Sequence, residues 1–490
     1  MNILRALINI FGLSALVVLP VAAQGHEIKI AVKADNDTVM LGHYFAKQDM
    51  LIPDDTIVLN KSGYGVFKGN RKLDKGMYFI VSDRRKLFDF IVGDEQNFEI
   101  TATDTADLVN GIRFKNSAEN DVLVAFQRTN VRMSIEADRL RKEIEAASQE
   151  KKDAIRQQLF DLSKERLEYI QKLADTHEGL FVSKFLKALI PMTTKLPDYP
   201  RDTMGNITDS TYVYRWYRAH FFDNFDIFDQ DMIRTMLYED KVIEYFRSVL
   251  PQIPDTLCAE AGKIFQKVKD DNVLFRYMLI TLFNHYAKSD IIAFENVWVN
   301  LAEKWYIPYA TWTSADYLKT LKKEVEERLP NLIGKIAPPI EMMMALPPDH
   351  FKAAALDTAI KFDLHAGTPL KDFRQSVKTK YTVLLFWDIT CSHCRETIQA
   401  LHEVYENELK GKNVTVITVQ MLNTKDAKGK WVDFVNEHQL LDWTNAWSPY
   451  DAVFKKTYNA ATVPLIYVLN EKKEIVGKRL TPDQLHLFIR

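Results

Sequence analysis

Two cysteines separated by two residues, Cys391 and Cys394, have the type and spacing that suit redox chemistry. They follow a run of β-branched and large apolar residues, Tyr381 to Trp387, which predicts a strand buried on both faces. From the second cysteine onward, apolar side chains recur at i+4, i+7 and i+11, as one face of a helix requires: Ile398, Leu401 and Tyr405. The pattern therefore predicts a strand, a short loop and a helix that begins at the cysteine pair.

The two cysteines are expected to differ in environment. Cys391 would lie at the start of the helix, among unpaired backbone amides and the positive end of the dipole, which favour a thiolate. Cys394, one turn later, would point toward the core. Thiol–disulfide exchange needs this asymmetry, because an exposed sulfur attacks and a shielded partner resolves the mixed disulfide.

Two other interpretations of the cysteine pair stay open. A zinc site would need two further ligands at comparable spacing, and the sequence has no second Cys-x-x-Cys pair. A structural disulfide is the other, although it would not need a corner between a strand and a helix. We favour redox exchange.

The residues after the cysteine pair predict an alternating α/β segment. A second strand is expected over Val414 to Gln420, a helix around Trp431, two more strands, and a terminal helix capped by Thr481 with Pro482 at its first position. The two later strands are expected at 465–469 and 475–480. The predicted order is β-α-β-α-β-β-α.

Three short motifs carry a resemblance to a known family. They are Phe386-Trp387 ahead of the cysteines, Thr462-Val463-Pro464 ahead of a strand, and Gly334-Lys335-Ile336-Ala337-Pro338. With them, about the last third of the chain resembles the thioredoxin superfamily, and within it the TlpA/ResA-like thiol–disulfide oxidoreductases of bacterial envelopes, of the Bacteroidetes type. The resemblance implies that Cys391 is the nucleophile and Cys394 the resolving cysteine. It also implies that Pro464 is a cis-proline beside the disulfide that offers backbone to the substrate polypeptide.

His393 lies between the two cysteines. A cation or donor at this position would stabilise the Cys391 thiolate, lower its pKa and make the pair more oxidising. The alternative is a histidine that faces solvent at a helix start. The chain also departs from the family pattern. Thr390 stands where many thioredoxins have tryptophan, and Leu385 stands where they often carry a buried acid. Asp388 is nearby, but a loop carboxylate more often caps or is solvated.

The N-terminus predicts export. Arg5 is followed by an apolar run, residues 6–19, and by small residues at 21–23 that resemble a cleavage site, so residues 1–23 are expected to be a signal peptide. A membrane anchor is the alternative, but the run is short for a span. A net charge of −2 and a pI near 6.6 argue against nucleic acid as a partner. We expect a periplasmic protein, soluble after cleavage.

Four further segments are expected after the signal peptide. Alternating short runs predict an antiparallel β-sandwich at 24–111. Residues 112–178 contain no glycine or proline, which predicts a long helical arm or hairpin at 112–190. An all-α domain at 191–331 and the thioredoxin-like domain at 332–490 follow, with residues 342–365 as an insertion that could flank the active-site face. The first and third of these segments resemble domains that precede thioredoxin modules in Bacteroidetes envelope proteins.

Two features of the helical region are ambiguous. Its aromatic residues are expected either to pack in a core or to line a groove for a peptide or partner: Tyr212, Tyr214, Trp216, Tyr217, Phe221 and Phe222. Cys258 shares a predicted helix face with Ala261 and Phe265, so we expect a buried, inert thiol rather than a third exchange thiol.

These observations predict a periplasmic thiol–disulfide oxidoreductase that uses a Cys-Ser-His-Cys motif, and we favour a reductase. Its expected partners are cysteine-containing envelope proteins and a membrane-embedded thiol reductant or oxidant. No cofactor and no metal ion is expected, and the oligomeric state is open. The redox direction also stays open, because related proteins reduce their clients whereas His393 favours oxidation. The alternatives are an envelope binding or scaffold protein with an idle or regulatory thioredoxin-like domain, and a Cu(I)-handling protein using Cys391, Cys394 and His393.

Overall fold

The computed structural model describes residues 25–33, 37–102, 107–340, 344–365, 367–369, 372–422, 424–447 and 453–490. The chain forms two compact units, one ending at Val249 and one beginning at Leu250. The expected signal peptide, residues 1–23, lies outside the described residues, and the predicted boundaries at 111/112, 190/191 and 331/332 stay predictions. Within the described ranges, no helix is both long enough and apolar enough to cross a membrane.

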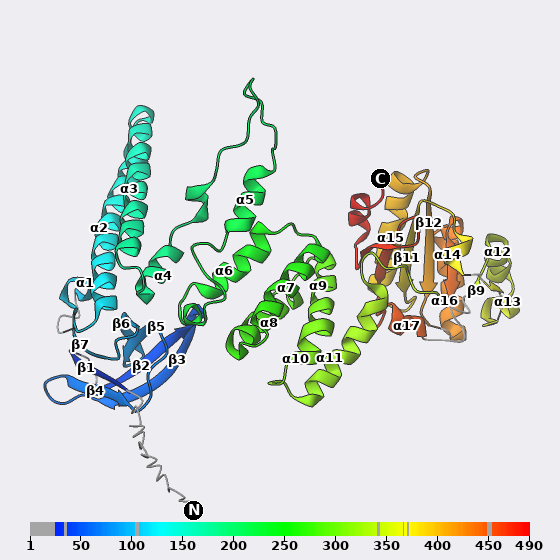
Figure 1. Ribbon diagram of the computed structural model, residues 1–490. Helices are drawn as coiled ribbons and strands as arrows, with labels where there is room; N and C mark the ends of the chain where they lie inside the picture. The colour runs from blue at the N-terminus through cyan, green and yellow to red at the C-terminus, as the bar shows by residue number, and fades with distance from the viewer. Residues whose placement is uncertain are drawn as a thin grey trace, which may run out of the picture. The chain divides into compact units, whose positions relative to one another are not determined.

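The first unit begins with a β-sandwich of two four-stranded sheets, as predicted (Figure 1). One sheet has the order β4 (Tyr64–Gly69), β1 (His26–Val32), β7 (Asn97–Ala102), β8 (Arg113–Lys115), and the other β3 (Lys47–Val58), β2 (Thr38–Phe45), β5 (Gly76–Ser82), β6 (Arg85–Val92). Apolar residues of both inner faces form one core, including Ile28, Ile30, Phe67, Phe90 and Phe98. The pairing is antiparallel except between β1 and β7, which run parallel. Strands of the other sheet lie between these two in the sequence, so turn signals did not predict their pairing.

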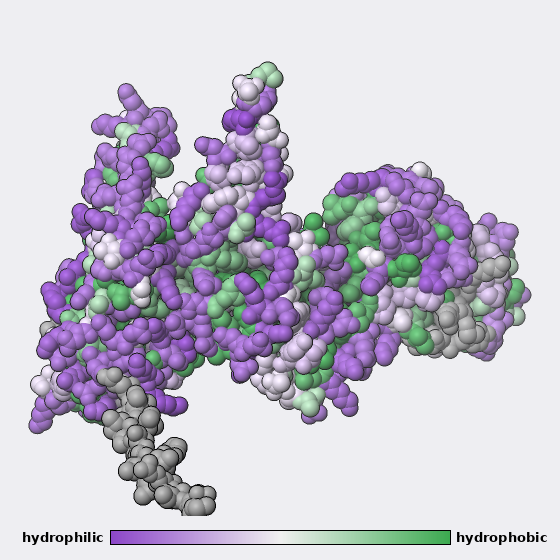
Figure 2. All heavy atoms as spheres, viewed as in Figure 1, coloured by the Kyte–Doolittle hydropathy of each residue, from purple (hydrophilic) through white to green (hydrophobic). Residues whose placement is uncertain are grey.

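Most of the stretch without glycine or proline forms a helical hairpin, but the helical prediction was wrong at its start, where Arg113–Lys115 is strand β8 and pairs with β7. After a short α1 (Leu108–Gly111), α2 (Ala118–Ala146) and α3 (Gln149–Thr176) run antiparallel with a break at residues 147–148. The Tyr169 hydroxyl donates to the Ala125 carbonyl at 3.1 Å, which ties the two helices together. Few side chains are buried along the outer part of the hairpin, and its surface is mostly hydrophilic (Figure 2).

The rest of the first unit is helical: α4 (Phe181–Ala188), η1 (Met192–Lys195), α5 (Tyr212–His220), η2 (Gln230–Arg234), α6 (Tyr238–Glu244) and η3 (Tyr245–Val249). The buried Glu119 carboxylate of α2 accepts the backbone N–H groups of Phe181 and Val182 at 2.8 and 2.7 Å, which fixes the start of α4. Among the aromatic residues singled out above, Phe221 is buried, whereas Tyr212 and Tyr214 are exposed. Core packing therefore accounts for only part of this set.

The second unit begins with helices: α7 (Pro254–Val268), α8 (Asn272–Ala287), η4 (Ile292–Phe294), α9 (Glu295–Leu301), η5 (Ala302–Tyr306), α10 (Ile307–Tyr309), α11 (Ala315–Arg328) and η6 (Leu329–Asn331). Cys258 lies half-buried on α7, and Ala261 and Phe265 on the same helix are fully buried. Burial raises the pKa of Cys258 to about 11. The thiol therefore stays protonated near neutral pH, as expected of an inert cysteine.

A seven-stranded sheet follows, in the order β10-β9-β13-β12-β11-β14-β15. Its central strands coincide with the predicted ones: β11 (Tyr381–Trp387), β12 (Val414–Gln420) and β14 (Leu465–Leu469). β15 (Ile475–Lys478) ends two residues before the predicted position 480. The predicted order was incomplete, because it lacked β9 (Met344–Ala345), β10 (Thr368–Pro369) and β13 (Thr444–Trp447). Strands of two to four residues are too short to show a period.

Helices cover both faces of this sheet (Figure 1). Residues of β11 alternate between the two faces, with Val383, Leu385 and Trp387 in one core and Leu384 and Phe386 in the other. The first core is closed by α12 (Pro348–Leu356), α15 (Ser392–Val404), α16 (Lys425–Glu437) and η9 (Pro482–Leu487). The second is closed by α14 (Phe373–Ser376) and α17 (Val453–Thr457). The remaining short helices are α13 (Thr358–Phe362), η7 (Tyr405–Leu409) and η8 (Leu440–Asp442).

A buried ion cluster joins the helices of the second unit to its sheet. The Glu295 carboxylate of α9 pairs with Lys478 of β15 and with Arg328 of α11, at 2.6 Å for the arginine. Lys478 is 1% exposed, and its Nζ also donates to the backbone and side-chain oxygens of Asn331 at 2.9 and 3.0 Å. Burial opposes the charge on Glu295, but the surrounding cations outweigh it and lower the pKa of the carboxyl. Charged side chains from two helices, α9 and α11, and from strand β15 therefore meet in one buried cluster.

Candidate functional site

Cys391 is the N-cap residue of α15 and lies where the loop after β11 becomes a helix. Its backbone is extended, with φ −85° and ψ 120°, and its Sγ accepts the backbone N–H of Cys394 at 3.3 Å. Its own N–H donates to the Asp388 carbonyl at 3.1 Å. The sulfur thus occupies the position of an N-cap side chain, where unpaired N–H groups and the helix dipole stabilise negative charge. The predicted placement at the helix start is confirmed.

Cys394 is fully buried, whereas Cys391 is partly exposed, and both are free thiols. Cys394 packs in the same core as Ile398 and Leu401, as the helical spacing predicted. Burial, and after it the hydrogen bond with Cys391, raises the pKa of Cys394 to about 12. The pair therefore combines an accessible sulfur with a shielded one that holds its proton.

Pro464 lies beside this pair by topology. The Val463–Pro464 peptide bond is cis, as the resemblance implied. The following residue, Leu465, pairs with Phe386 of β11, close to the point where the chain leaves the sheet toward Cys391. Val463 and Cys391 also pack against the same hydrophobic core. Sheet register thus brings Pro464 to the cysteine loop although the two positions are 73 residues apart in sequence (464 minus 391).

His393 points outward. Its side chain is 76% exposed, and its Nδ1 lies 3.7 Å from a carboxylate oxygen of Glu396, one turn along α15. The imidazole of His393 therefore has an acid as a neighbour on the same helix. A positive charge on His393 would favour the Cys391 thiolate, and the negative charge of the neighbouring Glu396 would oppose that effect.

The loop before Cys391 is held by polar contacts. The Asp388 carboxylate accepts both the backbone N–H and the hydroxyl of Thr390 at 2.8 Å, so Asp388 caps the loop. The Arg395 guanidinium donates to the Ile389 carbonyl at 2.8 Å. This role of Arg395 was not predicted from the sequence. The one feature of the sequence that could have indicated this role is the position of Arg395 directly after the second cysteine, within reach of the preceding loop.

The position in the central strand where thioredoxins often carry a buried acid is occupied by Leu385, which is fully buried. It lies opposite Thr418 in β12, whose hydroxyl donates to the Asn445 side-chain carbonyl at 2.9 Å. Thr418 and Asn445 are both buried. Neutral hydrogen-bonding groups thus occupy the interior behind the cysteine pair, and proton transfer to or from Cys394 has no carboxylate at position 385.

An open groove runs beside the cysteines between α15 and α16. It is lined from α15 by Ser392, Arg395, Glu396 and Gln399, and across from them by Lys430, Asp433, Phe434, Glu437 and His438, with Ile389 at one end. The insertion packs on α16, since Lys361 pairs with Asp433 at 2.6 Å and Asn436 donates to the Phe351 carbonyl at 3.0 Å. The sequence alone did not predict this groove, because its two walls come from helices that precede and follow β12 in the chain.

Metal-ligating side chains do not gather at the site. In the part of the chain that the structure describes, no three His, Cys, Asp or Glu side chains are grouped so as to hold a metal ion. The three residues of the copper interpretation, Cys391, His393 and Cys394, therefore do not form a ready-made ligand set in this conformation.

A protein-family model described as thioredoxin-like matches residues 379–475. This range begins just before β11, ends at the start of β15 and includes Cys391, Cys394 and Pro464. The strand order and the two helical layers agree with the match. The C-terminal part of the chain therefore has a thioredoxin-like fold, and this prediction is confirmed.

Similar folds occur among solved structures. A thioredoxin-like protein from Bacteroides caccae is 17% identical, with 60% of this chain and 96% of that chain covered and a TM-score of 0.38. The thioredoxin domain of a thiol-disulfide oxidoreductase from Bacteroides vulgatus is 20% identical, with 32% and 98% covered and a TM-score of 0.25. A secreted disulfide oxidoreductase from Mycobacterium tuberculosis is 22% identical, with 24% and 86% covered and a TM-score of 0.21. Identities and TM-scores this low support no conclusion about activity. No curated protein matches the chain.

Proposed function

We propose that this protein is a thiol–disulfide oxidoreductase that acts on protein cysteines through Cys391 and Cys394. The observation that carries the proposal is the asymmetry of the pair within a thioredoxin-like fold. Cys391 caps α15 with a partly exposed sulfur, whereas Cys394 is buried. The Cys391 sulfur lies 3.3 Å from the amide nitrogen of Cys394. A structural disulfide would not need one exposed, thiolate-favouring sulfur.

The exchange proceeds in two steps. The Cys391 thiolate attacks one sulfur of a client disulfide, so that a mixed disulfide forms and the other client sulfur leaves as a thiolate. Cys394 then loses its proton to solvent and attacks the Cys391 sulfur. The Cys391–Cys394 bond forms, the second client thiolate leaves, and two electrons have passed to the client. The reverse sequence oxidises a client dithiol.

The structure gives a reason for the order of these steps. Burial is the largest cause of the raised pKa of Cys394, and the hydrogen bond and charge of Cys391 add to it. Once Cys391 is part of a mixed disulfide, it carries no negative charge, and that contribution to the Cys394 pKa disappears. Cys394 therefore becomes easier to deprotonate only after the first step, which keeps it from competing as a nucleophile.

Three further residues have proposed roles. Pro464 would present backbone to the client chain next to Cys391, from its place before β14. His393 would tune the stability of the Cys391 thiolate, opposed by its neighbour Glu396. Arg395 would hold the loop that carries Cys391 through its bond to Ile389.

We place the activity in the periplasm, because residues 1–23 have the pattern of a signal peptide. The clients would be cysteine-containing envelope proteins. As a reductase the pair would receive electrons from a membrane-embedded thiol reductant, since a disulfide forms at Cys391 and Cys394 in each cycle and must be reduced again.

A glutathione redox titration tests this proposal. The protein without its expected signal peptide and with Cys258→Ser is equilibrated in buffers of increasing reduction potential, and free thiols are trapped and counted. A reversible two-electron transition near about −270 mV would fit a reductase, and one near about −120 mV a strong oxidant. Failure to form any reversible Cys391–Cys394 disulfide would overturn the proposed activity.

A further inference from the structure

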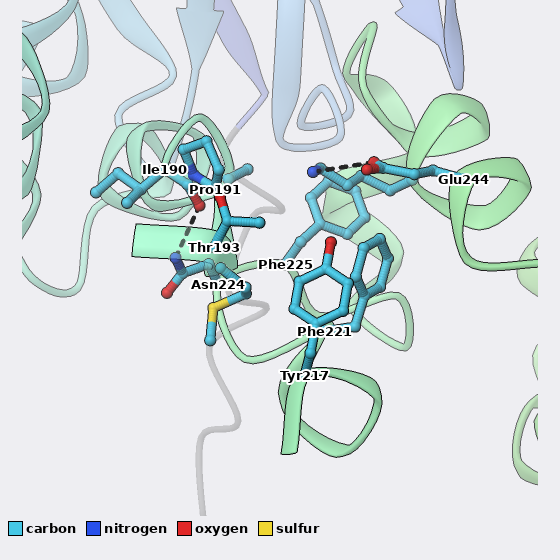
Figure 3. Close-up of a pocket in the computed structure, with 11 residues that line it drawn as sticks. Ile190, Pro191, Thr193, Tyr217, Phe221, Asn224, Phe225 and Glu244 are labelled. Atoms are coloured by element: carbon cyan, nitrogen blue, oxygen red, sulfur yellow. Dashed lines mark hydrogen bonds and ion pairs between the residues drawn. The ribbon is translucent and has the colours of Figure 1, made fainter. Parts of the chain in front are cut away.

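The pocket between η1 and α5 in the first unit is small and lined by buried rings (Figure 3). Its volume is about 170 Å³, and Phe221 and Phe225 in its wall are only 5% and 2% exposed. Asn224, which also lines it, already donates to the Ile190 carbonyl at 2.9 Å. This pocket therefore exposes too little surface to recognise a partner. The groove between α15 and α16 has a volume of about 510 Å³, within the usual range of about 300–1,000 Å³ for binding sites.

The groove between α15 and α16 begins beside Cys391. Ser392, the next residue, lines it, and Ile389, two residues before Cys391, lies at one end. Along α15 the groove runs from Ser392 to Gln399, seven positions (399 minus 392), or about 10 Å at 1.5 Å per residue. An extended chain advances about 3.3 Å per residue. The groove is therefore long enough for about three residues of a chain whose cysteine is at Cys391.

A contact between the two helices marks the far end of the groove. Gln399 and His438 are the last groove residues on α15 and α16, and the Gln399 side-chain nitrogen lies 3.4 Å from Nε2 of His438. The His438 ring also packs on Phe434, with ring centres 4.2 Å apart. Glu437 directly precedes His438 in α16, so its carboxylate belongs to this far part of the groove.

Ion pairs neutralise part of the charge along the α16 wall. Lys430 pairs with Asp426, which lies outside the groove, at 2.8 Å. Asp433 pairs with Lys361 of the insertion at 2.6 Å. Each pair is neutral as a unit, so neither gives the groove a net charge.

Two acids without a strong cationic partner are left, one on each wall. Glu437 on α16 is exposed, and no cation pairs with it in the part of the chain that the structure describes. Glu396 on α15 is 74% exposed and has His393 as a neighbour at 3.7 Å. Arg395 keeps its charge, but its guanidinium is bonded to the Ile389 carbonyl at the end next to the cysteines. The middle and far parts of the groove are therefore negatively charged.

We propose that this groove binds the client chain beside its reactive cysteine and selects clients with a lysine or arginine two or three residues from that cysteine. The inference rests on the proposed exchange at Cys391, because a sulfur–sulfur bond to Cys391 places the client at the start of the groove. Glu396 is four positions beyond Ser392, about 6 Å along α15, which about two extended residues span. A basic side chain at this distance would reach Glu396 on one wall and Glu437 on the other.

Reaction rates with two peptide disulfides test this selection. Each is a symmetrical disulfide of a short peptide with one cysteine, and carries either lysine or glutamate at the second and third positions on both sides of the cysteine. The reduced protein, without its expected signal peptide and with Cys258→Ser, should react about fivefold faster with the lysine peptide at about 0.1 M salt. The preference should shrink at 1 M salt, where charges are screened over about 3 Å. Dividing each rate constant by that for dithiothreitol removes the intrinsic reactivity of the peptide.

Glu437→Lys should remove or reverse this preference. The ratio of the two rate constants within one variant cancels any change in the reactivity of Cys391. Glu408→Lys is the matched control, because Glu408 is an exposed acid nine positions beyond Gln399, about 14 Å further along the helix. That distance exceeds the screening length of about 10 Å at 0.1 M salt. Equal rate constants for the two peptides in the wild type, an unchanged ratio in Glu437→Lys, or the same change in Glu408→Lys would overturn the proposal.

A small disulfide separates this inference from the proposed function. Dithiobis(nitrobenzoate) is too short to follow the groove, and its reduction by the Cys391–Cys394 pair releases both aromatic thiolates while the two cysteines form a disulfide. If the wild type releases both thiolates but does not distinguish the two peptides, exchange stands and the groove proposal is wrong. If no Cys391–Cys394 disulfide forms with this reagent, both the exchange activity and the selection of clients are wrong.

Discussion

The backbone amide of Cys394 donates a hydrogen bond to the sulfur of Cys391 over 3.3 Å, so the buried cysteine of the pair stabilises charge on the exposed one. This contact exists because Cys391 occupies the N-cap position of α15. A cap position aims a side chain at the amides of the first helical turn. Burial first, and then the hydrogen bond and charge of the Cys391 side chain, disfavour ionisation of the Cys394 thiol and raise its pKa to about 12.

Alkylation should therefore separate the two cysteines. At pH 8 a thiol with a pKa of about 12 is ionised in only about one molecule in ten thousand. We expect iodoacetamide to label Cys391 well before Cys394 in the reduced protein, as peptide mass spectrometry can show. Labelling of Cys394 first would contradict the assigned roles.

Serine substitutions should have different effects at the two positions. Cys391→Ser should reduce disulfide exchange by about 100-fold or more, since the attacking sulfur is lost. Cys394→Ser should leave the attack intact but trap the mixed disulfide, which accumulates on a non-reducing gel with a disulfide-bonded peptide. Cys258→Ser is the control and should behave like the wild type.

His393 and Glu396 should have opposite effects on Cys391. Glu396→Gln removes the acid next to the imidazole and should speed the alkylation of Cys391 at a fixed pH, whereas His393→Ala should slow it. Each change in rate should be less than about tenfold, because both side chains are about three-quarters exposed. The rate of Cys391 alkylation by iodoacetamide measures both. If His393 mediates the effect, Glu396→Gln should change the rate less in the His393→Ala background, and an equal change in both would exclude that mediation.

Lys428 should make stability depend on pH. Its side chain is 2% exposed, donates to the Asp363 carbonyl, and lies 4.7 Å from the ring centre of Trp447. Burial lowers the pKa of Lys428 to about 8. Between pH 8 and the ordinary lysine pKa near 10.4, the unfolded chain binds more protons than the folded one, so the free energy of unfolding should rise with pH. The gain should be up to about 3 kcal/mol.

Denaturation of wild type and Lys428→Met in parallel isolates this effect from other titrations. The difference in unfolding free energy between the two proteins should change between pH 8 and pH 10 in favour of the wild type. Lys430→Met on the same helix should show no such change, because Lys430 is 59% exposed. If the difference in unfolding free energy between wild type and Lys428→Met did not depend on pH, the charge on Lys428 would not destabilise the folded state.

The Glu295–Lys478 pair should be needed for the stability of the second unit. Glu295→Gln leaves Lys478 buried without its carboxylate partner, and removing one member of a buried pair typically costs about 3–5 kcal/mol. Urea denaturation measures the loss. The exposed pair of Lys430 and Asp426, 2.8 Å apart, is the matched control, and Asp426→Asn should be close to wild type. Comparable losses in the two variants would show that burial of the Glu295 cluster adds nothing.

The central features of the thioredoxin-like segment were predictable from sequence because each rests on a local pattern. A continuous apolar run predicted β11, apolar spacing of 3.6 residues predicted α15, and Pro482 after Thr481 predicted the last helical turn. The placement of Cys391 at a helix start followed from the junction of two such patterns. The pairing of β13 with β12 did not follow, because a strand of four residues has no readable period.

What only the tertiary structure decided is which charged and polar groups are buried and which apolar ones are left exposed. Lys428 and Lys478 have the sequence context of surface lysines, yet both are buried, Lys478 against an asparagine 147 residues away. Met204 is apolar, yet its side chain is 83% exposed. Burial depends on partners distant in sequence, and their positions depend on the packing of the whole unit. The sequence by itself thus determined the chemistry of the cysteine pair and the strands that carry it, and packing determined its surroundings.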